Sequence, residues 1–394
     1  MVILFINDLI KETMKTIITF KNIWLVGILF WGIALAACSD DEDSATPITI
    51  SSITTIKDLT TPITQAALGD FIAIHGTGLN IHNIDSVLVN NIRVDMKEVY
   101  AENNVLYMKI PVKIATKETD KVYVYNKAGV QEFALKAVAP DLSAERMFNE
   151  YTKPGDTIMI YGNFFKLYEI DSLNAVVDFN GKLSRVISSA DNYLTAKVPT
   201  DVDKNIKVKV KGLKYGVEAT CPGRYYDREC MIMDFDDLMP SDPTNVVTDV
   251  KDKQRFSGNF LRIDNKSAWS SWWYIASKDD VDYPADMYEH PEDYVVKCEF
   301  RTANQFIDGK IAFYNYLFWA IENPMAWKAT DFVIQNFNRW ETITLPLTLT
   351  RSEAYPYPTY GNDYYRSFNM RLDIDASIAR NFSFDNIRIY KKND

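Results

Sequence analysis

The sequence Leu-Gly-Asp-Phe-Ile-Ala-Ile-His-Gly at residues 68–76 decides the fold of the first half of the chain, because it returns as Pro-Gly-Asp-Thr-Ile-Met-Ile-Tyr-Gly at residues 154–162. A second matched pair follows in the same order, with Asn-Val-Leu-Tyr-Met-Lys-Ile-Pro at 104–111 and Asn-Tyr-Leu-Thr-Ala-Lys-Val-Pro at 192–199. Matched segments in one order indicate two copies of a single structural unit.

Each copy consists of short runs in which apolar and polar residues alternate, and Gly, Asn, Asp or Pro ends each run. Such alternation is typical of antiparallel strands that bury one face. The sequence therefore predicts two immunoglobulin-like β-sandwiches in tandem, at residues 48–139 and 140–226.

Both copies contain Gly-Asp-x-Ile-x-Ile-x-Gly, then a strand that ends in Asn-Asn or Asn-Gly, then a strand that ends in Ile-Pro or Val-Pro. This order resembles the IPT/TIG domain family. The resemblance implies an immunoglobulin-like fold and no particular ligand. We expect the two units to act as stiff spacers, with the alternative that they bind a ligand themselves.

The N-terminus has the features of a secretory signal. A basic start at Met14 is followed by an apolar run that ends in Leu-Ala-Ala-Cys at residues 35–38, and this run is short for a membrane span. The ending resembles the lipobox of bacterial lipoproteins, which implies cleavage of residues 1–38 before Cys38 and acylation of that cysteine. The alternative is an ordinary transmembrane anchor.

An acidic run, Ser-Asp-Asp-Glu-Asp, begins the segment at residues 39–47. Like charges keep such a segment extended, so we expect a tether. The run also resembles the export tag of Bacteroidetes lipoproteins, which implies a lipid anchor in the outer membrane that faces the cell exterior. The alternative is an anchor that faces the periplasm.

Charge and side-chain chemistry exclude several function classes. A net charge of −10 disfavours nucleic acid as a ligand, because nucleic acid rewards basic surfaces. Three histidines give little support to histidine-based catalysis. Besides Cys38 the chain has Cys221, Cys230 and Cys298, which lack metal-site spacing, while a bridge between Cys221 and Cys230 is sterically possible.

Six of the eight tryptophans lie between Trp269 and Trp340, and residues 39–268 contain none. In the same region alternating strands run from residues 232–236 to residues 381–390, without a competing helical period. We predict a single jelly-roll β-sandwich at residues 227–394, so that the whole fold is all-β.

Flat exposed rings suit the C–H faces of sugars, and polar groups beside them suit the hydroxyls. On this reasoning the candidate glycan-binding residues are Trp272, Trp273, Trp319, Trp327, Tyr314, Tyr316, Tyr357 and Tyr360. The alternatives are that some of these rings cap the core or form a lid, and we expect Trp340 to pack inward. The strand residues Asn315, Glu299 and Arg301 are further polar candidates, or belong to an ordinary solvated face.

Carboxylates mark the two ends of the C-terminal region. If the first and last strands are neighbours, Asp234, Asp236 and Asp385 meet, and oxygen ligands of this kind suit a structural calcium ion. The alternative is that turns are acidic for solubility alone.

Four segments carry a wider resemblance, namely residues 234–237, 260–263, 340–347 and 384–389. They look like carbohydrate-binding jelly rolls. With the lipobox, the acidic tag and the tandem units, the chain resembles the surface glycan-binding lipoproteins that Bacteroidetes encode beside starch-utilisation-type importers, in particular the xyloglucan-binding type.

The resemblance implies capture of a neutral plant polysaccharide without catalysis, beside an outer-membrane importer and a surface endo-glycanase. Xyloglucan, mixed-linkage glucan and mannan all stay open as the glycan. Two other functions also stay open. One is a glycoside hydrolase, which needs a pair of carboxylates across a cleft, and the other is an adhesin-like protein-binding surface.

Overall fold

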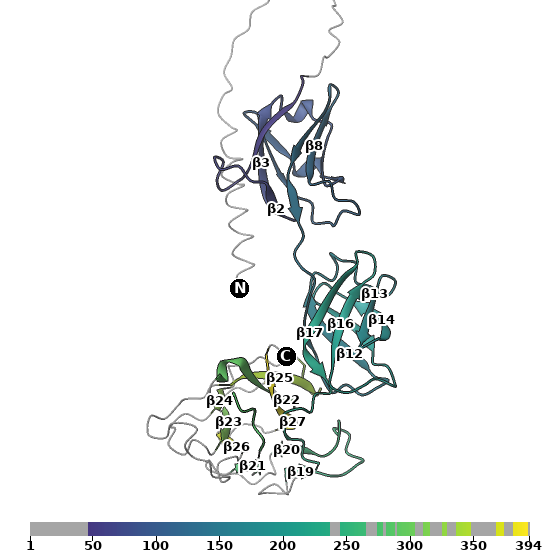
Figure 1. Cartoon of the computed structure of the whole chain (residues 1–394), viewed down its shortest axis with the longest axis vertical. Helices are drawn as coiled ribbons and strands as arrows, with labels where there is room; N and C mark the ends of the chain where they lie inside the picture. Colours follow the sequence, from purple (N-terminus) through teal and green to yellow (C-terminus); the bar gives the residue numbers. More distant parts are fainter. Residues whose placement is uncertain are drawn as a thin grey trace, which may run out of the picture. The chain divides into compact units, whose positions relative to one another are not determined.

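In the computed structural model, the described residues are 46–236, 245–264, 274–278, 281–287, 290–303, 310–315, 325–328, 336–347, 368–373 and 381–392. Cys38 and the predicted signal and acidic run lie outside them. Strands dominate throughout (Figure 1), which confirms the all-β prediction. The described part contains no helix that is long and apolar enough to cross a membrane.

The first sandwich has a four-stranded sheet on each side of an apolar core that includes Ile72, Ile74, Leu106 and Val124. One sheet has the order β1 (Thr49–Thr55), β3 (Phe71–Thr77), β7 (Val105–Lys109), β6 (Tyr100–Glu102). The other has the order β5 (Ile92–Arg93), β4 (Ser86–Val89), β8 (Lys121–Asn126), β9 (Gly129–Ala134). Two short strands, β2 (Gln65–Ala67) and β10 (Lys136–Val138), pair in parallel, and two 3-10 turns are η2 (Ile81–Asn83) and η3 (Met96–Glu98).

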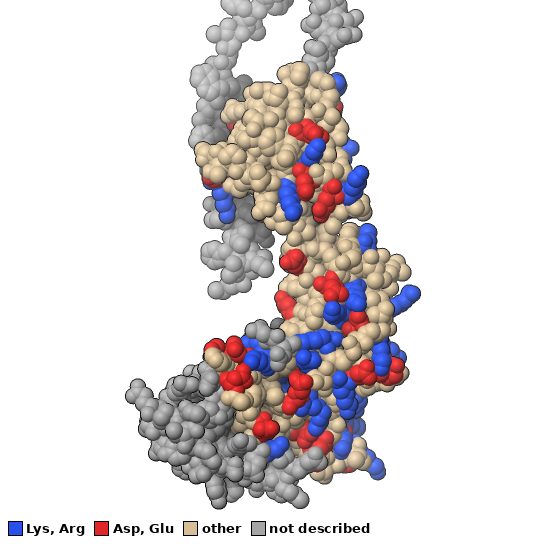
Figure 2. All heavy atoms as spheres, in the orientation of Figure 1, with Lys and Arg blue, Asp and Glu red and all other residues tan. Residues whose placement is uncertain are grey.

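The second sandwich is a seven-stranded sheet that folds over its own core, in which Phe165, Phe179 and Tyr225 are the largest buried rings. Its strand order is β11 (Ser143–Met147), β12 (Thr157–Asn163), β15 (Tyr193–Lys197), β14 (Lys182–Ser189), β13 (Ala175–Phe179), β16 (Ile206–Gly212), β17 (Val217–Tyr225). Figure 2 shows charges of both signs mixed over the surface of this sandwich.

The repeat seen in the sequence is a repeat of strand pairing. The pair Phe71 and Lys109 in the first sandwich corresponds to Thr157 and Lys197 in the second. The glycine at the end of the repeated motif is required for the same reason in both copies. A Cβ at Gly76 would lie 1.8 Å from the backbone oxygen of Thr49, and one at Gly162 would lie 2.0 Å from that of Ser143. Only glycine allows the neighbouring strand to approach so closely.

The C-terminal sandwich has two sheets around an apolar core that includes Val296, Cys298, Met370 and Ile387. The first sheet, here the junction sheet, has the order β19 (Val246–Val247), β20 (Phe260–Asp264), β27 (Asn381–Lys391), β22 (Tyr294–Thr302), β25 (Glu341–Pro346), and β18 (Met231–Met233) also pairs with β27. The second, here the distal sheet, has the order β21 (Tyr274–Lys278), β26 (Phe368–Asp373), β23 (Lys310–Asn315), β24 (Met325–Lys328). A 3-10 turn, η5 (Pro291–Asp293), precedes β22.

All three cysteines in the described residues carry free thiols, so Cys221 and Cys230 are not bridged. Cys221, a residue of β17, is fully buried, and burial raises the pKa of its thiol to about 12. A thiol in such surroundings is protonated and unreactive.

Candidate functional site

The two central strands of the junction sheet, β22 and β27, are buried on both of their faces. In β22 the alternate residues Val296, Cys298 and Phe300 belong to the apolar core. Their neighbours Lys297 and Glu299 point to the opposite face, and yet Glu299 has 0% of its surface exposed. A face lined with charges is therefore covered by another part of the protein.

Glu150, in the loop after β11 of the second sandwich, covers the charges of β22 and β27. Its carboxylate accepts from Lys297 Nζ at 2.6 Å and from Arg388 Nη2 at 2.6 Å. Arg388 Nη1 also donates to Glu299 Oε2 at 2.9 Å. Two cations and two anions thus form a neutral ion cluster, here the junction cluster, and a buried charge requires such pairing.

Backbone and hydroxyl groups continue the contact between the second sandwich and the junction sheet. Thr342 Oγ1 donates to Glu299 Oε1 at 2.8 Å and accepts from the backbone N–H of Glu150 at 2.8 Å. The backbone N–H of Thr342 donates to the carbonyl of Phe148 at 2.9 Å. Asn149 Nδ2 donates to the carbonyl of Trp340 at 3.1 Å. Residues 148–150 therefore dock on β25 by direct hydrogen bonds.

The electrostatics of the junction follow from burial and pairing. Burial alone would raise the pKa of the Glu150 carboxyl, but the charges of Lys297 and Arg388 outweigh it and the pKa is lowered. Beside the cluster, burial raises the pKa of Asp385 well above its usual range, against a hydrogen bond from Ser257 Oγ at 2.6 Å. Glu150 is thus held as an anion, while Asp385 favours the neutral acid.

This arrangement corrects the expectation for Glu299 and Arg301. Neither the predicted sugar contact nor the solvated strand face applies, because Glu299 lies inside the junction cluster. Arg301 has 9% of its surface exposed, and its Nη2 donates to Asn338 Oδ1 at 3.0 Å. The side chain of Asn315 lies outside the described residues.

The predicted glycan-binding residues cluster in sequence around the strands of the distal sheet. Trp272 and Trp273 directly precede β21, Tyr316 and Trp319 follow β23, and Tyr357 and Tyr360 lie between β25 and β26. These six residues lie outside the described residues. Tyr314 in β23 and Trp327 in β24 have described backbones, but their side chains are not described. All eight assignments stay predictions.

Strand register separates Tyr314 from Trp327. Phe313 pairs with Met370, which is completely buried in the core, and Tyr314 pairs with Asn369, one residue out of phase with them. Trp327 pairs with Ile311, two residues from Phe313 and therefore in phase with Met370. Since successive residues of a strand alternate between faces, the backbone assigns Trp327 to a core row and Tyr314 to an outer row.

Trp340 packs inward, as predicted. Its indole N–H donates to the carbonyl of Gln254 at 2.7 Å. Its ring lies 5.6 Å from that of Phe256 and 5.5 Å from that of Phe260. A ring held by packing and by its polar atom serves the fold and not a ligand.

The three acidic residues predicted to hold calcium do not fit a calcium ion. The strands β18 and β27 are neighbours, as the prediction required. However, Asp234 pairs with Arg228 at 2.5 Å, Asp236 accepts from the backbone N–H of Asn259 at 2.7 Å, and Asp385 accepts from Ser257. Within the described ranges no three acidic, histidine or cysteine groups gather as a metal site would need. The oxygens that calcium requires already serve the protein.

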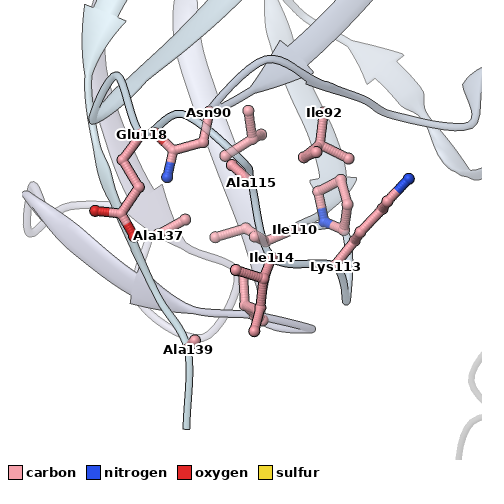
Figure 3. A pocket seen from close by; sticks show the side chains of 12 residues that line it. Asn90, Ile92, Ile110, Lys113, Ile114, Ala115, Glu118, Ala137 and Ala139 are labelled. Carbon is pink, nitrogen blue, oxygen red and sulfur yellow. The ribbon is translucent and has the colours of Figure 1, made fainter. Parts of the chain in front are cut away.

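A small pocket in the first sandwich was not predicted from the sequence (Figure 3). Its lining is mostly aliphatic and comes from residues such as Val89, Ile110 and Ala137. Asn90 lies at its edge, and its Oδ1 accepts from the backbone N–H of Asp120 at 2.7 Å. The lining contains no aromatic ring. It therefore lacks the platform that a sugar needs.

The fold defines the class of the protein, namely an all-β protein in which a C-terminal β-sandwich is docked on an immunoglobulin-like sandwich. Residues 225–391 match the family model of the surface glycan-binding protein B xyloglucan binding domain, and residues 145–223 match that of the IPT/TIG domain. The chain thus carries a domain of the surface glycan-binding protein B type behind an IPT/TIG domain. The two predicted domain types are thus confirmed for these residues.

Two solved structures are similar to this chain. A surface glycan-binding protein from Prevotella bryantii is 17% identical, with 88% of this chain and 99% of that chain covered and a TM-score of 0.53, which shows a shared fold. A second structure, from a complex xyloglucan utilization locus of Bacteroides uniformis, is 16% identical, with 88% and 100% covered and a TM-score of 0.46. No curated protein matches the chain.

Proposed function

We propose that this protein binds a neutral plant polysaccharide at the cell surface without cleaving it, through the outer face of the distal sheet and the loops around it. The match of residues 225–391 to a glycan-binding domain family carries the proposal. The structure supports the choice of face, because the second sandwich already covers the junction sheet through Glu150. A ligand that approaches the C-terminal domain therefore meets the distal sheet or its loops.

Xyloglucan is the ligand that we propose first, because the matched family model is a xyloglucan-binding domain. We assign stacking on pyranose rings to Trp272, Trp273 and Trp319, and to the outer-row Tyr314 together with Tyr316. The loop tyrosines Tyr357 and Tyr360 join them. Preformed rings lose little freedom on binding, so several weak contacts add along a polymer. Trp327, in a core row, serves the fold in this proposal.

The buried carboxylates support a binder over a hydrolase. A hydrolase needs two carboxylates that reach the substrate, one of them with a raised pKa. Asp385 has a raised pKa, but it is 1% exposed and hydrogen-bonded to Ser257, and Glu299 is locked in the junction cluster. Both of these acids are thus closed to a glycan.

Anchoring and partners complete the proposal. We place the protein in the outer membrane, held by a lipid on Cys38 and facing outward. There it would pass glycan to an importer complex after a surface endo-glycanase has cut it. Replacement of Cys38 by alanine should abolish labelling by a palmitate analogue and release the protein from membranes. Protein that stays membrane-bound without label would contradict the lipid anchor.

Affinity electrophoresis tests the binding function. Gels that contain xyloglucan, mixed-linkage glucan or glucomannan should retard the wild-type protein in at least one case. The double variant Trp272→Ala with Trp273→Ala should migrate freely, and Trp24→Ala offers a control in the segment expected to be cleaved. Wild-type protein that no polysaccharide retards, or that releases reducing ends from one of them, would overturn the proposal.

A further inference from the structure

The first sandwich carries exposed aromatic rings on the outer face of sheet β1-β3-β7-β6. The core of the first sandwich contains Ile72 of β3 and Leu106 and Met108 of β7. Successive residues of a strand alternate between faces, so the neighbours of these three residues in each strand face outward. On this face, Phe71 is 50% exposed and Tyr100 is 55% exposed, while Tyr107 is partly exposed. Tyr100 and Tyr107 are paired across β6 and β7, with ring centroids 6.1 Å apart and planes inclined by 31°.

The second sandwich shows that the fold does not require these rings. The register places Thr157 where the first copy has Phe71, because each pairs with the corresponding lysine. The pair Ser188 and Thr195 stands where the first copy has Tyr100 and Tyr107, and its hydroxyl oxygens lie 2.7 Å apart in a hydrogen bond. One strand ladder thus tolerates small polar residues at all three positions. Exposed rings in one copy therefore need a reason other than folding.

The chemistry around the rings suits an uncharged, hydroxyl-rich ligand. The Tyr100 hydroxyl donates to Glu102 Oε2 at 3.0 Å, and His75 Nε2 lies 2.9 Å from Thr54 Oγ1. Lys109 Nζ lies 5.8 Å from the Phe71 ring centroid, so the charges of Lys109 and Glu102 balance across the face. Figure 2 shows few charged side chains over β3 in the view given. A balanced face with rings and polar edges matches a neutral sugar chain better than an acidic polymer.

We propose that this ring face, formed by Phe71, Tyr100 and Tyr107, is a second contact surface for the neutral polysaccharide bound by the C-terminal domain. The inference rests on the proposed function and extends it. A polymer engaged at one site is held at high effective concentration near any other site on the same chain, so a weak second site strengthens its retention. A short oligosaccharide engages one site at a time and gains nothing.

The two copies supply the test variant. The triple variant Phe71→Thr, Tyr100→Ser and Tyr107→Thr installs what the second copy carries at matched positions. The matched control is Leu183→Thr with Ile187→Thr, which removes exposed apolar residues from β14 of the second sandwich. Binding is measured with polymeric xyloglucan by affinity electrophoresis and with a xyloglucan heptasaccharide by calorimetry.

We expect the triple variant to bind the polymer about tenfold more weakly than wild type and to bind the heptasaccharide equally well. The control should match wild type in both assays. Unchanged polymer binding in the triple variant would overturn the inference and favour a protein partner for the ring face. Wild-type protein that binds no polysaccharide would instead overturn the proposed function, and this inference with it.

Circular dichroism checks that the triple variant is folded. Should it unfold, the single variants Phe71→Thr and Tyr100→Ser replace it, because each changes one exposed side chain. Each should weaken polymer binding about threefold and leave the heptasaccharide affinity unchanged. Wild-type polymer affinity in both single variants would also overturn the inference.

Discussion

Two central strands, β16 in the second sandwich and β22 in the C-terminal sandwich, share one sequence pattern and differ in what covers them. In β16 the lysines between the core residues are partly exposed, and Lys209 pairs with Glu218 on the surface at 2.7 Å. In β22 every residue is buried, and Lys297 and Glu299 belong to the junction cluster. Alternation defines a strand and its two faces, but the polar face meets water in one case and protein in the other.

The difference shows which charged side chains are important for stability. Surface ion pairs such as Lys209 with Glu218 contribute little to stability because water screens them. A buried cluster contributes little as a whole but is costly to break, since the remaining charges lose their partners. The boundary between the second sandwich and the C-terminal domain therefore tolerates substitution less well than the surface of β16.

The largest expected effect follows from Arg388→Ala. This change leaves Glu299 without its cation and Glu150 with Lys297 alone, so one buried anion is uncompensated. We expect a loss of about 3–5 kcal/mol in the free energy of unfolding. Residues 39–268 contain no tryptophan, so in protein that begins at Ser39 tryptophan fluorescence during urea unfolding reports on the C-terminal domain alone. The control Lys209→Ala should change stability by less than about 0.5 kcal/mol. Equal effects of the two changes would mean that the buried charges of the junction cluster are no more important for stability than the exposed lysines of β16.

Glu150→Gln tests the junction from the other side. The residue lies in the second sandwich, yet we expect the tryptophan-detected stability of the C-terminal domain to fall by about 2–3 kcal/mol, because Lys297 and Arg388 lose their shared anion. Glu169→Gln, which removes a half-exposed partner of Lys214, serves as the control. An unchanged tryptophan transition in Glu150→Gln would mean that the two domains are energetically independent.

The row assignment in the distal sheet separates binding from folding. Tyr314→Ala should weaken polysaccharide retention about tenfold with an unchanged melting temperature. Trp327→Ala should lower the melting temperature instead, because the register gives it a core row. Affinity electrophoresis and thermal unfolding of both variants test this row assignment. The reverse pattern would show that strand alternation fails at this edge.

The smallest expected effect is on pH dependence. The pKa of Glu150 is lowered in the folded protein, so its contribution to stability is complete above its ordinary value of 4.5 and is lost as the pH falls through the lower folded value. The stability difference between wild type and Glu150→Gln should therefore be constant near pH 7 and shrink below pH 4.5. Urea midpoints over this range measure it. A difference that grows in acid would contradict the assigned charge state.

The sequence predicted the sandwiches because their causes are local. The closing glycines, the alternation and the repeat at residues 68–76 and 154–162 each follow from strand geometry. The junction cluster could not be predicted, because Glu150 and Arg388 lie 238 residues apart and nothing near Glu299 in the sequence distinguishes it from a solvated acid.

For the candidate site, the sequence located the aromatic region but misjudged its acidic residues. The first and last strands of the domain were correctly expected to be neighbours, since β18 pairs with β27, but Asp234, Asp236 and Asp385 do not gather as a metal site. Their partners, including Arg228 and Ser257, depend on turns that side-chain spacing does not encode. The rings on β3, β6 and β7 were missed for a similar reason, because tyrosine and phenylalanine in a strand suggest a core until the register shows which face they occupy.

The position of β27 bears on how the domain is made. This strand, Asn381–Lys391, pairs with both β20 and β22 and so lies in the middle of its sheet, although it follows both of them in the chain. Until it arrives, β22 has an unpaired edge and Glu150 lacks its arginine. The sheet can therefore close only after β27 has been made, and deletion of residues 381–391 should yield a product that proteases degrade.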